Sequence, residues 1–155
     1  MSFDEKYKKE NWLWGIEPTQ IVKSLLKYKK LGKVLDLGAG EGRNSIFLAE
    51  KGFDVTAIDI SEIGINKLKN IASKRNIKIN TLIEDVRNFN FNKTYDVIIS
   101  IATLHFLKRE DIVKVIEKMK KYTRKNGLNA ISVFTEENDE KGFPYLFKKG
   151  ELKNF

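Results

Sequence analysis

Three glycines at alternate positions follow a short apolar stretch in the first third of the chain. Val34, Leu35 and Leu37, within residues 33–37, predict a strand that is buried on both faces. Gly38, Gly40 and Gly42 come next, and the residues from Arg43 onward predict a helix. Glycine allows positive φ and lets a ligand approach the backbone closely. A strand, a glycine-rich turn and a helix in this order are typical of nucleotide sites, so we expect this turn to contact a ligand.

The spacing of the glycines argues against a pyrophosphate ligand. The dinucleotide fingerprint G-x-G-x-x-G would require glycine where this chain has Arg43. Two carboxylates follow the next predicted strands. Asp59, in the strand predicted for residues 54–60, is placed to accept hydrogen bonds from two ribose hydroxyls, and Asp85, at the end of the run 77–85, could accept one from an adenine amino group. Together these residues describe a site for an adenosine without a phosphate group.

The same residues resemble a known family. Residues 34–45, followed by residues 48–49 and 52–59, resemble the cofactor half of class I S-adenosylmethionine-dependent methyltransferases. Residues 42–45 and 142–152 resemble the tellurite-resistance type of that superfamily, and the match runs from about residue 17 to the end of the sequence. The resemblance implies a Rossmann-like fold, methyltransferase activity, S-adenosyl-L-methionine as the cofactor and S-adenosyl-L-homocysteine as its product.

The resemblance also implies which residues would hold the cofactor. The glycine turn would surround the methionine part together with Asp36, which could equally be a structural residue that bonds loop amides. Trp14 would belong to an N-terminal flap over the cofactor, or it would anchor the N-terminus by packing. The full set of predicted cofactor-binding residues is Trp14, Asp36, Gly38, Ala39, Gly40, Gly42, Arg43, Asn44, Asp59, Ile60, Asp85, Val86 and Ile101.

His105 is the only histidine in the chain, and it follows the strand predicted for residues 95–102. Histidine titrates near neutral pH, so His105 could act as a general base near the transferred methyl group. The alternative, which we favour, is a loop histidine packed by Leu104 and Phe106. No catalytic residue is therefore assigned, and the sequence shows no cluster of metal ligands.

Composition narrows the class of protein. The chain has 155 residues, a formal net charge of +8 and no cysteine, which excludes disulfides, thiolate metal sites and a cysteine nucleophile. The basic residues are spread over predicted helix faces, so we do not expect a nucleic-acid partner, although a positive field would favour an anionic substrate. Residues 100–103 also lack the Asn or Asp followed by two prolines that enzymes methylating the amino groups of bases place there.

The sequence predicts no membrane segment. No apolar run approaches the roughly 18 to 20 residues that a membrane span needs, and the charged start does not resemble a secretory signal. We therefore expect a cytoplasmic protein with no membrane partner.

The order of the predicted elements indicates an α/β fold in a single methyltransferase domain, residues 1–155. Residues 1–31 would form an N-terminal flap and helix, residues 32–135 the cofactor-binding core and residues 136–155 a partial C-terminal segment. We expect a Rossmann-like three-layer sandwich of mostly or wholly parallel strands in the order 3-2-1-4-5. The C-terminal antiparallel hairpin that is usual in class I methyltransferases would be lacking.

The C-terminal third carries two further predictions. A helix is predicted over residues 109–124, with Asn126 and Gly127 as its stop, and a fifth strand over residues 128–134. The edge of that strand would be open and apolar. Such an edge tends to pair with another chain, here as a homodimer, or to be covered by the tail.

These observations lead to one functional hypothesis and two alternatives. The hypothesis is a methyltransferase that acts on a small molecule, with a tellurite- or selenite-like oxyanion as the family-level guess for the acceptor. The first alternative is a non-catalytic S-adenosylmethionine-binding domain or partner subunit. The second is a nucleic-acid methyltransferase.

Overall fold

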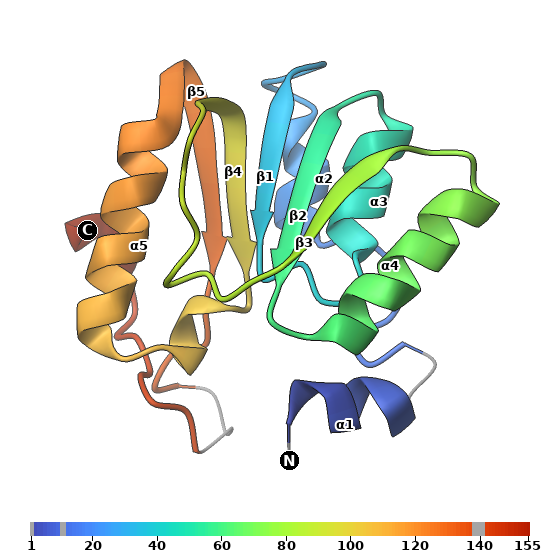
Figure 1. The fold of residues 1–155 in the computed structure, drawn as a ribbon. Coiled ribbons are helices and arrows are strands. Elements are labelled where there is room, and N and C mark those ends of the chain that lie inside the picture. The colour runs from blue at the N-terminus through green and yellow to red at the C-terminus, as the bar shows by residue number, and fades with distance from the viewer. Residues whose placement is uncertain (1, 10–11, 138–141) are drawn as a thin grey trace.

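The computed structural model describes residues 2–9, 12–137 and 142–155. These residues form one parallel sheet in the order β3-β2-β1-β4-β5 (Figure 1). The strands are β1 (Lys33–Leu37), β2 (Asp54–Asp59), β3 (Ile79–Ile83), β4 (Tyr95–Ile101) and β5 (Thr123–Ser132). The predicted fold class and strand order are confirmed.

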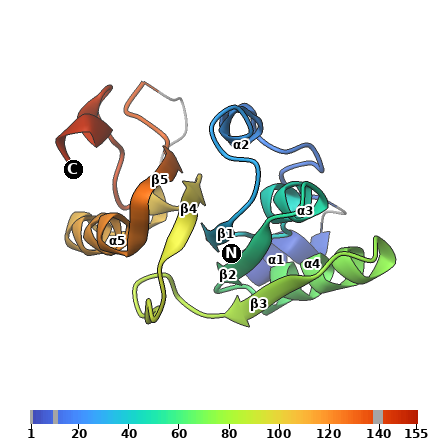
Figure 2. The same cartoon turned by 90° about the horizontal axis from the view of Figure 1, so that it is seen from above.

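Helices cover both faces of the sheet, which gives three layers (Figures 1 and 2). Side chains alternate between the faces of each strand. Val34 packs with residues of α2 and α3, whereas Leu35 and Leu37 share a core with α5. On that second face Phe89 and Phe91, from the loop between β3 and β4, are also buried. The helices are α1 (Phe3–Lys9), α2 (Gln20–Leu25), α3 (Arg43–Glu50), α4 (Glu62–Lys74) and α5 (Arg109–Tyr122), with short 3₁₀ turns at Leu104–Phe106 and Glu151–Asn154.

The predicted boundary between the last long helix and the fifth strand was wrong. Helix α5 ends at Tyr122, and β5 begins at once with Thr123. Asn126 and Gly127, predicted as a helix stop, lie inside β5, where Asn126 has a φ of +63° and the pairing with β4 shifts register between Tyr95 and Val97. Between these two positions β5 advances from Thr123 to Leu128 while β4 advances only from Tyr95 to Val97, so Asn126 and Gly127 lie in an irregular part of the strand rather than at a helix end.

The tail packs beside the chain that leaves β5. Thr135 and Phe147 form an isolated parallel bridge, and the Phe147 side chain is buried. Residues 138–141, within the C-terminal segment predicted for residues 136–155, lie outside the described residues. Pairing of the β5 edge with a second copy stays a prediction. None of the described helices is both long enough and apolar enough to cross a membrane.

Candidate functional site

A cavity of about 250 Å³ opens at the carboxyl ends of the strands. Ligands of open parallel sheets bind at this edge, where the strand order reverses, which in this sheet is between β1 and β4. Asp36 and His105 are not among its lining residues. The predicted residues that do line it are Trp14, Gly38, Ala39, Gly40, Gly42, Arg43, Asn44, Asp59, Ile60, Asp85, Val86 and Ile101.

The turn between β1 and α3 requires its glycines. Gly38, Gly40 and Gly42 have φ values of +78°, +56° and +87°. A Cβ atom on Gly38 would lie 2.3 Å from the Thr103 Oγ1 atom, and one on Gly42 would lie 2.2 Å from a methyl carbon of Leu68. Both conformation and space therefore exclude larger residues at these two positions, and the backbone of the turn stays exposed to the cavity.

Asp59 joins the glycine turn to the end of β2. Its Oδ2 atom accepts a hydrogen bond from the Gly40 N–H at 2.7 Å, and its Oδ1 atom accepts one from the Ser61 N–H at 2.8 Å. Burial raises the pKa of the Asp59 carboxyl, and these two hydrogen bonds oppose that shift. An ionised carboxylate has about four acceptor positions, so Asp59 can still accept hydrogen bonds from a ligand in the cavity.

Asp36 lies behind the cavity rather than in its wall. Its Oδ2 atom accepts a hydrogen bond from the Ser45 hydroxyl at 2.7 Å, which ties β1 to the first turn of α3. Burial raises the pKa of Asp36 to about 7, the hydrogen bond from Ser45 opposes the shift, and the charge of Asp59 adds to it. The contact is a structural one, although it is made to a side chain and not to loop amides.

Asp85 reaches the cavity as one half of an ion pair. The Arg87 Nε atom lies 2.9 Å from both carboxylate oxygens of Asp85, and both residues line the cavity. The hydrogen bonds from Arg87 lower the pKa of Asp85, so this carboxylate is ionised at neutral pH. The sequence analysis predicted Asp85 as a site residue but missed Arg87. The signal that could have revealed Arg87 was a basic residue two positions after an acidic one.

Several lining residues were not predicted. Tyr7 and Phe3 come from α1 and lie four residues apart, so they share one face of that helix. This i, i+4 aromatic pair was the signal that could have revealed a helix over the site. Thr103 follows Ala102, which has a φ of +56°, in the loop after β4. The remaining unpredicted lining residues are Gly15, Glu41, Phe106 and Leu107.

Comparison with known proteins assigns the chain to a family. The family model described as "Tellurite resistance protein TehB" matches residues 3–155. The chain belongs to the TehB family. The predicted resemblance to the tellurite-resistance type is thereby confirmed.

TehB of Haemophilus influenzae illustrates the similarity in both sequence and structure. The probable S-adenosyl-L-methionine-dependent methyltransferase TehB of Haemophilus influenzae is 37% identical over 126 residues, which are 79% of this chain and 44% of that protein. The crystal structure of TehB from Haemophilus influenzae aligns with a TM-score of 0.82 and 34% identity, covering 97% of this chain and 53% of that one. The chain thus spans less than half the length of the curated TehB relatives that it matches.

A more distant relative was solved with a ligand. The plantazolicin methyltransferase BpumL, in complex with SAH, aligns with a TM-score of 0.61 and 27% identity over 74% of this chain and 44% of that one.

In this TehB-family chain His105 is packed away from the cavity. The ring is fully buried and stacks on Phe134, with ring centroids 4.3 Å apart and planes at 17°, while Phe143 meets it edge-on. Its Nδ1 atom accepts a hydrogen bond from the Phe134 N–H at 3.3 Å, and its Nε2 atom has no partner among the described residues. Burial lowers the pKa of His105 to about 4. The geometry supports the packing interpretation rather than a general base.

Within the described ranges, no group of three or more His, Asp or Glu side chains is arranged to hold a metal ion.

Proposed function

We propose that this chain binds S-adenosylmethionine and transfers its methyl group to a small molecule. One observation carries the proposal: a single cavity gathers a glycine turn, the first turn of a helix and carboxylates from two neighbouring strand ends. The name of the Haemophilus influenzae relative supports the activity, and the BpumL complex with SAH supports the cofactor.

The residues around the cavity fit an adenosine joined to an amino acid. Asp59 would accept hydrogen bonds from the ribose hydroxyls, and Asp85 would accept one from the adenine amino group. Ile60 and Val86 would provide apolar contact for the base. No side chain caps the N-terminus of α3, so its free amides, together with the guanidinium of Arg43, would favour a carboxylate.

The main contribution of the protein to catalysis would be to position the reactants. Bound S-adenosylmethionine supplies a methyl group on a positively charged sulfur, so an electron pair of the acceptor can form the new bond to carbon while the carbon–sulfur pair stays with sulfur. The chain would hold the reactants in line and exclude water, an effect worth up to about 7 to 11 kcal/mol in well-oriented systems. Phe3, Tyr7 and Ile101 are the apolar and aromatic walls available for this task.

For the acceptor we propose a tellurite- or selenite-like oxyanion. The family description supports this choice, and a net charge of +8 would raise the local concentration of anions. The test is transfer of radiolabelled methyl from S-adenosylmethionine to tellurite or selenite, with arsenite and a catechol as comparison acceptors. Label in a tellurium or selenium product supports the oxyanion, whereas label in the catechol alone would contradict it.

Cofactor binding without catalysis is the second candidate. It is favoured by the position of His105, because the one histidine faces away from the cavity and leaves its described lining without an imidazole. Calorimetry and a methyl-transfer assay separate the two candidates, since both require binding and only the first requires a methylated product.

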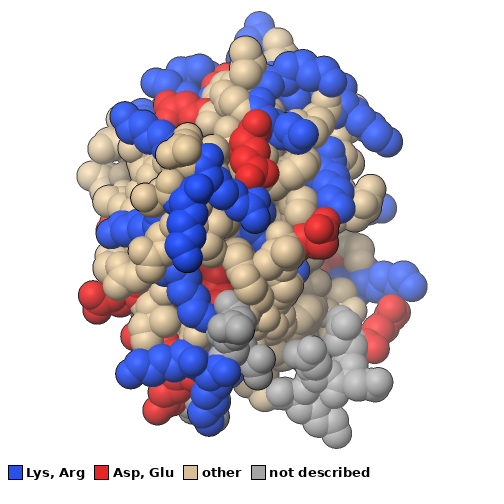
Figure 3. All heavy atoms as spheres, turned by 90° about the vertical axis from the view of Figure 1, so that its right-hand side faces the viewer, with Lys and Arg blue, Asp and Glu red and all other residues tan. Residues whose placement is uncertain are grey.

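A nucleic-acid substrate has less support. Figure 3 shows that on the face over α3 and α4 the Lys and Arg side chains are dispersed, with acidic side chains among them. A nucleic-acid enzyme would show affinity for RNA or DNA that falls steeply with added salt. We expect only weak, sequence-independent binding.

The role of Arg43 can be tested with two ligands. S-adenosylhomocysteine carries the amino-acid part, and 5′-methylthioadenosine lacks it. Arg43→Met should weaken binding of the first by about 1.5 to 3 kcal/mol, the value of a hydrogen bond to a charged group, and should leave the second unchanged. Equal losses for both ligands in calorimetry would remove Arg43 from the carboxylate site.

A further inference from the structure

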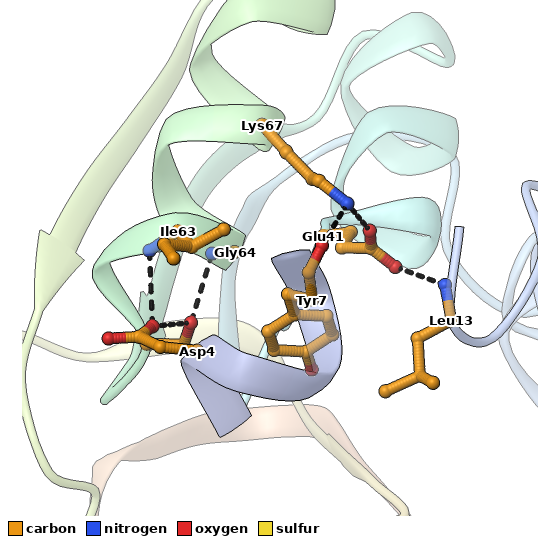
Figure 4. A network of polar contacts seen from close by, with 8 residues as sticks. Asp4, Tyr7, Leu13, Glu41, Ile63, Gly64 and Lys67 are labelled. Carbon is orange, nitrogen blue, oxygen red and sulfur yellow. Dashed lines mark hydrogen bonds and ion pairs between the residues drawn. The ribbon is translucent and has the colours of Figure 1, made fainter. Parts of the chain in front are cut away.

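Helix α1 lies at the cavity and is fastened to the core near its first residues by Asp4 (Figure 4). The Asp4 Oδ1 atom accepts hydrogen bonds from the Ser61 hydroxyl and, at 3.3 Å, from the Ile63 N–H. The Ser61 Oγ atom in turn accepts one from the Gly64 N–H at 3.0 Å. Asp4 and Ser61 therefore cap the N-terminus of α4 together.

A second fastening lies at the other end of α1 and involves the glycine turn itself. The Lys67 ammonium on α4 donates to the Tyr7 carbonyl oxygen and, at 2.7 Å, to the Glu41 Oε1 atom. The Glu41 Oε2 atom accepts a hydrogen bond from the Leu13 N–H at 2.7 Å. Figure 4 shows Lys67 and Leu13 both contacting the Glu41 carboxylate. We call Glu41 and Lys67 the latch.

The latch holds an aromatic roof over part of the cavity. Tyr7 is buried, and its hydroxyl oxygen lies only 2.5 Å from the position that a Cβ atom on Gly40 would take. At the start of α1, Phe3 packs edge-on against Phe106 in the loop after β4, with ring centroids 4.9 Å apart. Helix α1 thus reaches from α4 on one side of the cavity to the β4 loop on the other.

The roof cannot keep its place without such contacts. An isolated helix as short as α1, with seven residues, is unstable in water. Glu41 lies between two glycines that line the cavity, yet both of its carboxylate oxygens bind the segment around α1 or its anchor on α4. Its side chain is 4% exposed, so lifting α1 together with the segment at Leu13 would leave a buried carboxylate without its Leu13 partner and would take the Tyr7 carbonyl away from Lys67.

We propose that Glu41 and Lys67 are positioning residues that control cofactor exchange, which rests on the proposed function. With the latch closed, Tyr7 covers the part of the cavity next to Gly40, and α1 must lift before a cofactor enters or leaves. Weakening the latch raises the population of the lifted state, in the manner of a local opening. The residence time of the cofactor is therefore set by the ion pair of Glu41 with Lys67, which takes no part in the methyl transfer.

Stopped-flow fluorescence with S-adenosylhomocysteine tests this on the full chain, with Trp14 in the cavity wall as the reporter. Glu41→Gln keeps the shape of the side chain and removes its charge, and Lys67→Met keeps the apolar stem. Glu50→Gln is the matched control. Glu50 pairs with Arg75 at the same distance of 2.7 Å, but this pair is partly exposed and lies at the C-terminal ends of α3 and α4. Hydrogen exchange of the amides of residues 3–9 supplies a second measurement.

We expect the ligand to dissociate about tenfold faster from Glu41→Gln and from Lys67→Met, the factor that corresponds to one hydrogen bond to a charged group. The amides of α1 should exchange faster in both variants, and Glu50→Gln should match the wild type. Because both changes open the same latch, the double variant should release the ligand less than a hundredfold faster. The conservative Glu41→Asp should recover part of the slow release.

Two results would overturn the latch, and a third is distinct from both. Dissociation rates equal to those of Glu50→Gln would show that α1 does not control exchange. Unchanged amide exchange in α1 would show that the ion pair does not hold it. Failure of the wild type to bind S-adenosylhomocysteine would instead overturn the proposed function. If Glu41→Gln does not fold, Lys67→Met still decides the question, because Lys67 is partly exposed.

Discussion

Mild acid should destabilise this fold through His105 by an amount that can be worked out. Burial lowers the pKa of His105 to about 4 in the folded chain, whereas the ordinary value of 6.5 applies when the chain is unfolded. The contribution is therefore fully present above pH 6.5 and is lost as the pH falls toward the folded pKa, because the unfolded chain binds the proton more readily. These two values correspond to a loss of about 2 kcal/mol between pH 7 and pH 5.

Asp36 works in the opposite direction over the same pH range. Burial raises its pKa from 3.8 to about 7, so the folded chain binds this proton more readily and mild acid stabilises it. The wild type alone would therefore show little net change. The variant His105→Phe isolates the histidine, because it keeps an aromatic ring against Phe134, removes the titration and leaves Asp36 in both chains.

Urea titrations from pH 7 to pH 5 measure the free energy of unfolding of the wild type and of His105→Phe. The wild-type value minus the variant value should fall by about 2 kcal/mol across this range. A difference that stays constant would mean that His105 titrates normally in the folded chain. That result would refute its burial as a neutral ring and would revive it as a candidate base.

Three further changes test the site. Gly38→Ala should lose more stability and more S-adenosylhomocysteine affinity than Gly150→Ala. Both glycines have φ near +80°, but only at Gly38 would a Cβ atom clash with Thr103. Equal losses in thermal and calorimetric titrations would contradict this. Asp59→Ala should weaken S-adenosylhomocysteine binding by about 1.5 to 3 kcal/mol in calorimetry, and unchanged affinity would remove Asp59 from the site. In urea titrations, the stability of Asp36→Asn minus that of the wild type should rise by about 2 to 3 kcal/mol between pH 5 and pH 8. A difference that does not change with pH would contradict the raised pKa of Asp36.

The sheet was predictable because its signals are local. Runs rich in apolar residues, such as residues 33–37 and 95–101, are typical of strands buried between layers, and the glycine turn identifies the first crossover. The same strand ends bring Asp59 and Asp85 to one cavity, since the carboxyl ends of parallel strands meet at one edge.

The sequence predicted an N-terminal flap over the cofactor, but it did not indicate which contacts would hold a helix there. Helix α1 is short and highly charged, and its place depends on partners distant in the sequence, such as the contact of Asp4 with Ile63 and that of Tyr7 with Lys67. Glu41 presents a similar difficulty. Its position between two glycines suggests a ligand contact, and only the fold shows that both of its oxygens bind protein groups.

The central claim is that the cavity holds an adenosine joined to an amino acid, and a thermal-shift comparison tests it most directly. S-adenosylhomocysteine at 100 times its dissociation constant should stabilise the chain by about 2.7 kcal/mol, while NAD at the same concentration should leave the melting temperature unchanged. Stabilisation by NAD with no response to S-adenosylhomocysteine would contradict the claim.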